Sequence, residues 1–462
     1  MNTASSQVRG PSDGVFDVAV VGGGLSGMVA ARDLKRSGLS NFVVLEARDR
    51  VGGRTITQHV DGLPVDGGAT WVNPNQTAVI DLLHELELDR FPQYTDGDAF
   101  AVIGGNAQRS KPVAPDPRFA QLVNEMAFAV PLHAPWEAPN AAAWDAMTCE
   151  DFLNQADLTP AERMIAEITF QITFCAPLNE MTLLNALFVL HSTGGFEGIG
   201  AVGSGVPQFH VVGGTAGMSE KIAEDIGDAL RLSSPVTAIS NWQEDQGPVR
   251  LETPSGTYEA HRVILAMGGS LSSQIRFEPE LPELRAGLHE TIDKDHCLIK
   301  THTTYSRPFW RDMGASGQII SPDGVFNVSS DVTPPDSTQG VLVTLALSPR
   351  ESDGTAISRD DRKAKTLEAF AACFGEEALS PTDWVMQDWL DETYTRGDED
   401  VWSRGLFLDY GPALRAPIDR LVWAGTETSL FWCGYLDGAV RAGHQSALTA
   451  LRALAAERSV FA

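Results

Sequence analysis

Three glycines near the start of the chain have the spacing of a turn that binds phosphate groups. Gly22, Gly24 and Gly27 follow the mostly apolar, β-branched run 16–21, and residues 25–36 have the length and alanine content of a helix. In a G-x-G-x-x-G turn the first glycine allows the tight bend, the second lets the backbone approach a pyrophosphate, and the third lets the helix pack closely on the strand. The N–H groups at the start of the helix can then bind the phosphates.

An acidic residue stands at the end of the next predicted strand, 41–45. The carboxylate of Glu46 can accept hydrogen bonds from ribose hydroxyls, and it would repel a 2′-phosphate, which argues against NADP. An ordinary βαβ unit that binds nothing would need neither the acid nor the glycine spacing. The stretch therefore predicts a dinucleotide site, and the fingerprint alone leaves NAD and FAD open.

A lysine in the second half of the chain is the other residue that could do chemistry. Lys300 lies in CLIKTHTT, residues 297–304, which alternates like a strand. A half-buried lysine on such a strand is costly unless it has a partner. The position therefore indicates either a functional site or a lysine on the solvent face of its strand.

The composition indicates a soluble globular protein. The chain has 462 residues, enough for two or three domains, with 43% hydrophobic and 21% charged residues. A formal net charge of −27 argues against nucleic acid and an anionic membrane surface as partners. No apolar run has the length of a membrane span, and the polar residues 1–12 are predicted to be a disordered tail rather than a signal peptide.

The cysteines and histidines indicate neither disulfide bonds nor a metal. The five cysteines are odd in number and show no metal-ligand or redox spacing, and the ten histidines form no ligand pattern. We therefore expect a reducing compartment, a cytoplasmic location and no metal site.

The residues that follow Glu46 resemble a known family. EARDRVGGRT, residues 46–55, is similar to the flavin-dependent amine oxidase family, which includes monoamine oxidases, polyamine oxidases and nicotine oxidoreductase. VDGGATWV at 65–72 resembles the family's DxGG segment, and AGTET followed by GYLDGAV, within 424–440, resembles its C-terminal signature. The likeness extends from about residue 16 to residue 451. L-Amino acid oxidases, carotenoid desaturases and protoporphyrinogen oxidase share the broader pattern.

The resemblance implies an α/β fold combined with an α+β fold. A Rossmann-type FAD-binding domain would comprise residues 13–88, 213–290 and 396–462, interleaved with a substrate domain of antiparallel sheet and helices from residues 89–212 and 291–395. The resemblance also implies FAD as the cofactor. Its expected binding residues are Gly22, Gly24, Leu25, Ser26, Gly27, Glu46, Ala47, Arg48, Gly53, Arg54, Gly68, Ala69, Thr70, Val236, Trp389, Gly425, Glu427, Tyr435 and Leu436.

The resemblance also gives roles to residues near the flavin. The family lysine that matches Lys300 holds a water against nitrogen 5 of the flavin, and the tyrosine that matches Tyr435 forms one wall of an aromatic cage for the amine. Trp389 and Trp432 are expected near the isoalloxazine ring or in the core. The candidates for the substrate pocket are Trp432 and, from approximate register, Ile172, Phe174, Ile199 and Phe326.

Two departures from the family pattern bear on the substrate. The segment YTRGDED has Asp398 where monoamine oxidases carry the cysteine that binds flavin covalently, and Glu399 where they carry the second cage tyrosine. FAD is therefore expected to be non-covalent, with a cage that is half acidic or completed by Trp402. L-Amino acid oxidases bind the substrate carboxylate with an arginine that WVNPNQT, residues 71–77, lacks. An acid at Glu399 would also repel a carboxylate.

The resemblance therefore implies oxidation of an amine that lacks an α-carboxylate, with Lys300, Tyr435 and Glu399 as the catalytic candidates. The imine product would hydrolyse to an aldehyde or ketone. Reduced flavin would pass its electrons to O2, giving hydrogen peroxide, or to a protein acceptor. A desaturase acting at a C–C bond and a flavoprotein without catalysis are the alternatives. The oligomeric state stays open, although dimers are common among such proteins.

Overall fold

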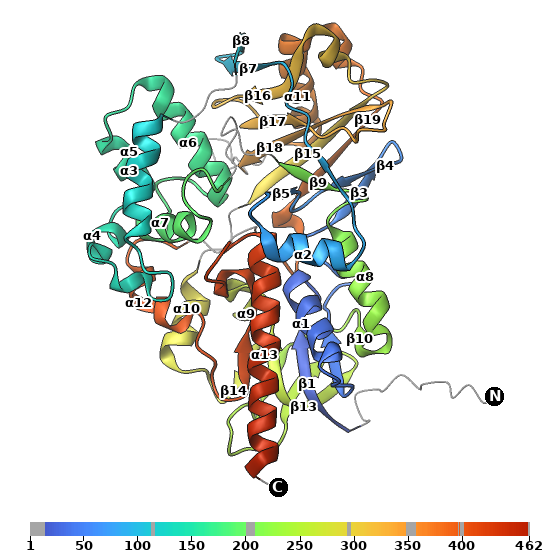
Figure 1. Cartoon of the computed structure of the whole chain (residues 1–462), viewed down its shortest axis with the longest axis vertical. Helices are drawn as coiled ribbons and strands as arrows, with labels where there is room; N and C mark the ends of the chain where they lie inside the picture. The colour runs from blue at the N-terminus through green and yellow to red at the C-terminus, as the bar shows by residue number, and fades with distance from the viewer. Residues whose placement is uncertain are drawn as a thin grey trace, which may run out of the picture. The chain divides into compact units, whose positions relative to one another are not determined.

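The computed structural model describes residues 14–111, 116–199, 208–292, 297–347, 357–395, 397 and 402–460 (Figure 1). The chain forms two compact units. Unit 1 comprises Met1–Arg54, Ala216–Ile292 and Asp409–Ala462, and unit 2 comprises Thr55–Thr215 and Asp293–Leu408. Residues 55–88, which the sequence assigned to the cofactor domain, thus lie in unit 2. The predicted tail at residues 1–12 lies outside the described residues.

Unit 1 is built on a sheet whose centre is parallel. Strand β1 pairs in parallel with β2 on one side and with β13 on the other, and β13 also pairs in parallel with β20. The strand order is β10 (Leu230–Arg231), β2 (Phe42–Leu45), β1 (Val15–Val21), β13 (Gly256–Leu265), β12 (Val249–Thr253), β11 (Ala238–Ser240) and β14 (Arg276–Glu278), with β20 (Leu421–Trp423) beside β13. The central strands are almost wholly buried, as apolar parallel strands require.

Helices cover this sheet. Helix α1 (Leu25–Arg36) contacts both α8 (Ala216–Ile226) and α13 (Leu436–Val460), and Figure 1 shows α1 and α13 side by side. A Cβ at Gly443 of α13 would lie 2.5 Å from the carbonyl oxygen of Ser26, so only glycine allows the two helices to approach this closely. The other helices of unit 1 are α9 (Gly269–Ser272) and α10 (Glu283–Thr291).

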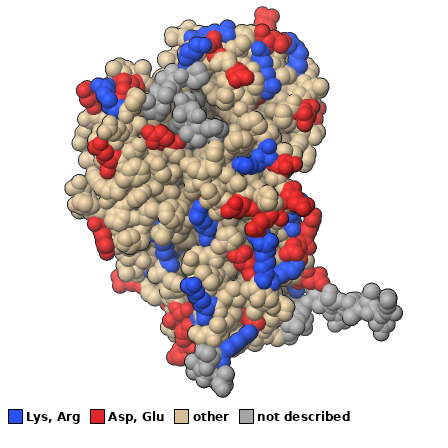
Figure 2. Space-filling model, viewed as in Figure 1, with Lys and Arg blue, Asp and Glu red and all other residues tan. Residues whose placement is uncertain are grey.

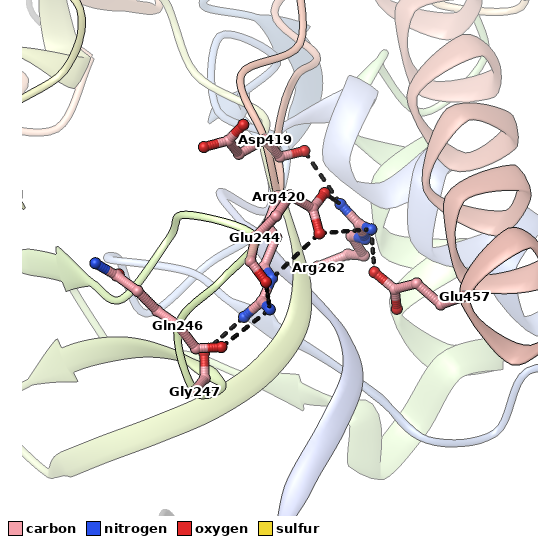
Figure 3. Close-up of polar contacts among 7 residues, drawn as sticks. All are labelled: Glu244, Gln246, Gly247, Arg262, Asp419, Arg420 and Glu457. Carbon is pink, nitrogen blue, oxygen red and sulfur yellow. Dashed lines mark hydrogen bonds and ion pairs between the residues drawn. The ribbon is translucent and has the colours of Figure 1, made fainter. Parts of the chain in front are cut away.

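A buried arginine ties the C-terminal helix to the sheet (Figure 3). The side chain of Arg262, on β13, is 6% exposed and forms ion pairs with Glu244 and with Glu457 of α13. It also donates to the carbonyl oxygen of Asp419 at 3.1 Å. Arg420 donates from the neighbouring segment to the carbonyl oxygen of Glu244 at 2.6 Å. The pairs hold together four segments that are distant in sequence.

Unit 2 contains a mostly antiparallel sheet of seven strands. The order is β19 (Asp383–Asp388), β15 (Leu298–Tyr305), β18 (Gly340–Leu347), β17 (Val328–Asp331), β16 (Ala315–Ile320), β7 (Asp98–Ile103) and β8 (Asn106–Ser110). Only the described pair β16 and β7 runs parallel. Helix α11 (Arg359–Phe374) packs on one face, where Ile299, Tyr305 and Phe370 share a core. The other face carries Lys300, because successive residues of a strand point to opposite faces.

Short strands and a group of helices complete unit 2. The strands β3 (Thr57–Val60) and β4 (Leu63–Asp66) form a hairpin, and β5 (Trp71–Val72), β9 (Phe209–Val211) and β6 (Arg90–Pro92) form a small sheet. The helices are α2 (Thr77–Glu85), α3 (Pro117–Phe128), α4 (Ala141–Asp145), α5 (Cys149–Gln155), α6 (Pro160–Phe174) and α7 (Leu183–Ser192), while α12 (Leu406–Tyr410) spans the last boundary. The combination of a Rossmann-type unit with a unit of antiparallel sheet and helices confirms the predicted fold class.

The buried arginine of unit 1 yields a stability prediction. We expect Arg262→Met to lower the free energy of unfolding by about 2 kcal/mol, because it leaves Glu457 without this cation and Glu244 with Arg420 alone, although both carboxylates are partly exposed and can be rehydrated. Arg458→Met is the matched control on α13, since this arginine is 65% exposed in its pair with Asp17 and should contribute less than about 0.5 kcal/mol. Urea unfolding of both variants checks the difference, and equal losses would contradict it.

Candidate active site

The glycine turn of unit 1 is shaped so that only backbone fits. Gly22 has φ +103°, and a Cβ there would lie 2.6 Å from the carbonyl oxygen of Ala266. A Cβ at Gly27 would lie 2.0 Å from the carbonyl oxygen of Gly22. Helix α1 begins after Gly24, and no side chain among the described residues caps it. The N–H groups of its first turn are therefore the kind of donors that bind a phosphate.

Glu46 and the second glycine pair lie against this turn. The carboxylate of Glu46 accepts the N–H of Gly23 at 2.5 Å and that of Arg48 at 2.9 Å. The N–H of Gly52 donates to the carbonyl oxygen of Gly23 at 2.8 Å, and a Cβ at Gly53 would lie 3.2 Å from the Cα of Gly24. The structure thus brings the two glycine motifs and the acid into one cradle, which fits the diphosphate and ribose of a dinucleotide.

Two aromatic residues of the C-terminal signature, Trp432 and Tyr435, lie directly before helix α13. The rings of Trp432 and Tyr435 meet edge to face, with centroids 5.2 Å apart. Trp432 has φ +55°, a rare conformation for a residue with a side chain, and a Cβ at Gly438 would lie 2.1 Å from its carbonyl oxygen. Backbone strain of this kind clusters at functional sites, so this corner is a candidate for binding. Leu436 is buried at the helix start.

The remaining predicted cofactor residues of unit 1 lie in the first turn of α1 or in the segments that follow strands. Leu25 and Ser26 are buried in that turn. Gly425 follows β20, and its missing Cβ leaves room for the Glu427 carboxylate, which such an atom would meet at 1.9 Å. The others are half-buried, namely Ala47, Arg48, Arg54 and Val236.

Lys300 is buried in unit 2, which excludes the solvent-facing alternative. Its side chain belongs to a residue that is 5% exposed, on strand β15. The ammonium nitrogen donates to the carbonyl oxygen of Gly68 and, at 2.5 Å, to the hydroxyl of Thr70. It also lies 4.9 Å from the ring centroid of Trp71, within range of a cation–π contact. Oxygen atoms and an aromatic face thus replace water around the charge.

The turn that holds Lys300 is itself held by side chains. Trp389 donates from its indole nitrogen to the carbonyl oxygen of Gly67 at 3.2 Å, and Thr215 donates from its hydroxyl toward that of Ala69 at 2.7 Å. With the contact from Lys300, the three carbonyl groups of residues 67–69 each lie within hydrogen-bond distance of a side-chain donor. The structure therefore brings Gly68, Ala69, Thr70, Trp389 and Lys300 together.

Three ionisable groups that sequence reasoning missed surround this turn. Burial raises the pKa of Asp66 to about 6, against the opposing effects of the Thr215 hydrogen bonds and the Lys300 charge. Burial and the Lys300 charge lower the pKa of His210 to about 3. The same causes, with His210 added, hold the pKa of His302 well below its ordinary value. The i+2 spacing of Lys300 and His302 on one strand was the signal that could have found this histidine.

The pocket candidates divide between the faces of the sheet. Ile172 packs against a cluster on the Lys300 face that includes Ile320 and Leu345. Phe326 packs against Phe370 of α11 on the opposite face, at 5.7 Å between centroids, which argues against its role in a pocket because the sheet separates it from Lys300. Phe174 pairs with Phe170 at 5.7 Å, and Ile199 is 9% exposed.

The structure does not confirm a second wall of the amine cage, for which Glu399 or Trp402 is predicted. Asp398 and Glu399 lie outside the described residues. The Trp402 ring packs edge-on against Phe407 at 4.6 Å, as a core residue does. No described group of His, Cys, Asp and Glu could hold a metal ion, and no described helix is long and apolar enough to span a membrane.

Comparison with known proteins identifies the family. The sequence model of the flavin-containing amine oxidoreductases matches residues 25–451. The chain belongs to this family. Flavin-containing amine oxidase A of Canis lupus familiaris and amine oxidase B of Homo sapiens are each 33% identical over 95% of this chain and 86% of their own length.

Solved structures of amine oxidases have the same fold as this chain. Putrescine oxidase bound to putrescine has a TM-score of 0.87 at 30% identity, covering 95% of this chain and 99% of its own. Cyclohexylamine oxidase from Brevibacterium oxydans IH-35A has a TM-score of 0.87 at 28% identity, covering 96% and 100%. The protein is therefore a flavin-containing amine oxidoreductase, an enzyme whose cofactor is FAD, and the cradle of unit 1 has the donors and the space that the cofactor's diphosphate needs.

The buried histidine of this site predicts acid sensitivity. His210 has a folded pKa of about 3 against 6.5 when unfolded, so the unfolded chain binds the proton first and stability is lost as the pH falls below about 6.5. We expect His210→Phe, which keeps a ring beside Phe91, to remove roughly 2 kcal/mol of the destabilisation that the wild type suffers between pH 7.5 and pH 5. Urea midpoints at both pH values measure it.

The exposed His59 on β3 provides the control for this measurement. His59→Phe makes the same substitution at an exposed position, so it measures the effect of the substitution itself. A His210→Phe protein that is as acid-sensitive as the wild type would show that His210 is not held neutral.

Proposed function

We propose that this enzyme oxidises the C–N bond of an amine that lacks an α-carboxylate, giving an imine that hydrolyses to an aldehyde or ketone, and that O2 reoxidises the flavin with release of hydrogen peroxide. The observation that carries the proposal is the burial of Lys300 against Gly68, Thr70 and Trp71. A desaturase acting at a C–C bond would not need this ammonium.

The segment after the turn supports the choice of substrate. The carboxylate clamp of an L-amino acid oxidase would need a cation there, but this segment carries amides that bind the backbone. The side chain of Gln76 accepts the N–H of Asn73 at 3.1 Å, and the Asn73 amide donates to the carbonyl oxygen of Gly198 at 3.0 Å. Both side chains are buried and already hydrogen-bonded to the backbone. They therefore offer no binding site for the α-carboxylate of an amino acid substrate.

In this proposal the residues of the chain orient the substrate and a water molecule. When bound, FAD supplies the acceptor for the hydride of the amine. In unit 2, Lys300 would hold a water in one place, with its ammonium fixed by two oxygen atoms. In unit 1, the Tyr435 face would orient the amine, and Trp432 would fix the Tyr435 ring by edge contact. Glu399 would bind a second polar group of the substrate.

The acidic surface is consistent with a small amine as the partner. The net charge of −27 raises the local concentration of cations, and the substrate amine is cationic before it loses its proton. On the face in Figure 2, the described Lys and Arg side chains lie among Asp and Glu rather than in one basic patch. The five cysteines are buried free thiols, which supports a reducing, cytoplasmic location.

Anaerobic mixing with amines tests the proposal. We expect one class among monoamines, diamines and cyclic amines to bleach the flavin absorbance, and amino acids to leave it unchanged. Readmitted O2 should restore the colour and yield one hydrogen peroxide per amine. Bleaching without reoxidation by O2 would instead establish a dehydrogenase with a protein acceptor, and no bleaching would favour a C–C desaturase or a flavoprotein without catalysis.

Lys300→Met is the matched variant for that experiment. Methionine fills similar space without the charge, so the variant should keep FAD and should be reoxidised by O2 at least ten times more slowly. Reoxidation at the rate of the wild type would remove Lys300 from the mechanism.

We propose that FAD is bound without a covalent link, because Asp398 stands at the position of the family's linking cysteine. Acid precipitation of the enzyme should then release all flavin absorbance into the supernatant. Yellow colour that stays with the washed protein pellet would disprove a non-covalent cofactor.

A further inference from the structure

One carboxylate at the site has no part in the function proposed above. Asp66, which is 6% exposed, stands directly before the turn at residues 67–70. Its Oδ1 accepts hydrogen bonds from the backbone N–H of Thr215 at 2.8 Å and from the Thr215 hydroxyl at 3.0 Å. The same hydroxyl lies 2.7 Å from the carbonyl oxygen of Ala69. Asp66 and Lys300 therefore act on the same turn.

Thr215 makes this turn sensitive to the charge of Asp66. A hydroxyl carries one hydrogen, so Thr215 donates either to Asp66 or to Ala69. An ionised carboxylate takes that hydrogen, because hydrogen bonds to a charged acceptor are the stronger ones. A protonated Asp66 can donate its own hydrogen to the Thr215 oxygen, and the hydroxyl then turns to Ala69.

Asp66 changes its charge in the range where an enzyme works, and its neighbours do not. Three described groups have a pKa that the charge of Lys300 shifts, namely Asp66, His210 and His302. Burial lowers the pKa of His210 to about 3, far below that of Asp66, and holds the pKa of His302 well below its ordinary value, so both imidazoles are neutral near pH 7. Of these three groups, only the carboxylate therefore alters the field at Lys300 near neutral pH.

We propose that Asp66 is a positioning residue for Lys300: its charge decides whether the Thr215 hydroxyl donates to Asp66 or to Ala69, and thereby sets the position of the turn whose Gly68 and Thr70 oxygen atoms hold the ammonium group. The ionised carboxylate also supplies the negative charge that opposes the buried cation. This inference rests on the role of Lys300 in the proposed function. It assigns Asp66 no contact with substrate or cofactor.

Flavin reoxidation at different pH values tests the inference. The enzyme is reduced with dithionite, so that the measurement does not depend on any amine, and is then mixed with O2. We expect the rate constant of the wild type to change with an inflection near pH 6, where Asp66 titrates. Asp66→Asn keeps the acceptor oxygen and removes the charge, so its rate should be about tenfold lower at pH 8 and should lack the inflection.

Two further variants separate the charge from the hydrogen bond. Thr215→Val should move the inflection to higher pH, because the Thr215 hydroxyl lowers the pKa of Asp66. Asp145→Asn is the matched control, since this aspartate of unit 2 is also buried and accepts from the Thr182 hydroxyl at 3.1 Å and the N–H of Leu408 at 3.0 Å. Its profile should match that of the wild type.

A second measurement reports on Asp66 without any catalysis. The folded pKa lies above the unfolded value of 3.8, so ionisation of Asp66 lowers stability as the pH rises through about 6. The melting temperature of Asp66→Asn relative to the wild type should therefore rise by about 3 °C between pH 4.5 and pH 8.

An unaltered inflection in Asp66→Asn would overturn the inference. If Asp66→Asn loses FAD, the Thr215→Val variant decides instead. A pH inflection of its reoxidation rate at the wild-type position would then overturn the inference. Failure of the proposed function looks different, because no amine would then reduce the wild-type flavin, while the dithionite experiment would still report on Asp66.

Discussion

The burial of one ammonium group governs the architecture of unit 2. An ammonium that leaves water needs close oxygen atoms or an aromatic face, and Lys300 obtains both from the turn after β4 and from Trp71. That turn must therefore lie against strand β15. The amide of Gln58, on β3, donates to Gln387 of β19 at 2.9 Å, which ties the hairpin before the turn to the same sheet. Residues 55–72 belong to unit 2 for this reason, although their sequence suggests a flavin segment.

The architecture of unit 1 depends instead on the close approach of the helix α1 backbone to the glycine turn and to helix α13. Helix α1 is fixed at its start by the contact of Gly27 with the turn at Gly22, and along its length by the contact of Gly443 with Ser26. A side chain at any of these glycines would push the helix away from the sheet or from α13. The donors at its N-terminus would then move from the place where a diphosphate binds.

Local signals made part of this structure predictable. Helix α1 covers the predicted residues, because the glycine turn and the pair Ser37–Gly38 mark both of its ends within the segment itself. The resemblance placed Lys300 and the DxGG segment each beside the flavin, but it gave no contact between the two. The parallel pair of β16 and β7 could not be predicted, since these strands are joined only by contacts between residues far apart in sequence. The side of the sheet on which Phe326 lies could not be predicted either, because a loop residue has no strand register to place it.

The polar cluster around Lys300 was missed because burial, and not residue type, gives these groups their properties. The Nδ1 atom of His302 and the Nε2 atom of His210 have no hydrogen-bond partner among the described residues, which costs stability. Both rings stay neutral, so they fill space beside the ammonium without adding a second positive charge. Dry surroundings also strengthen every remaining electrostatic contact of Lys300. In such surroundings one carboxylate, Asp66, can influence one ammonium strongly, whereas the same pair in water would be screened.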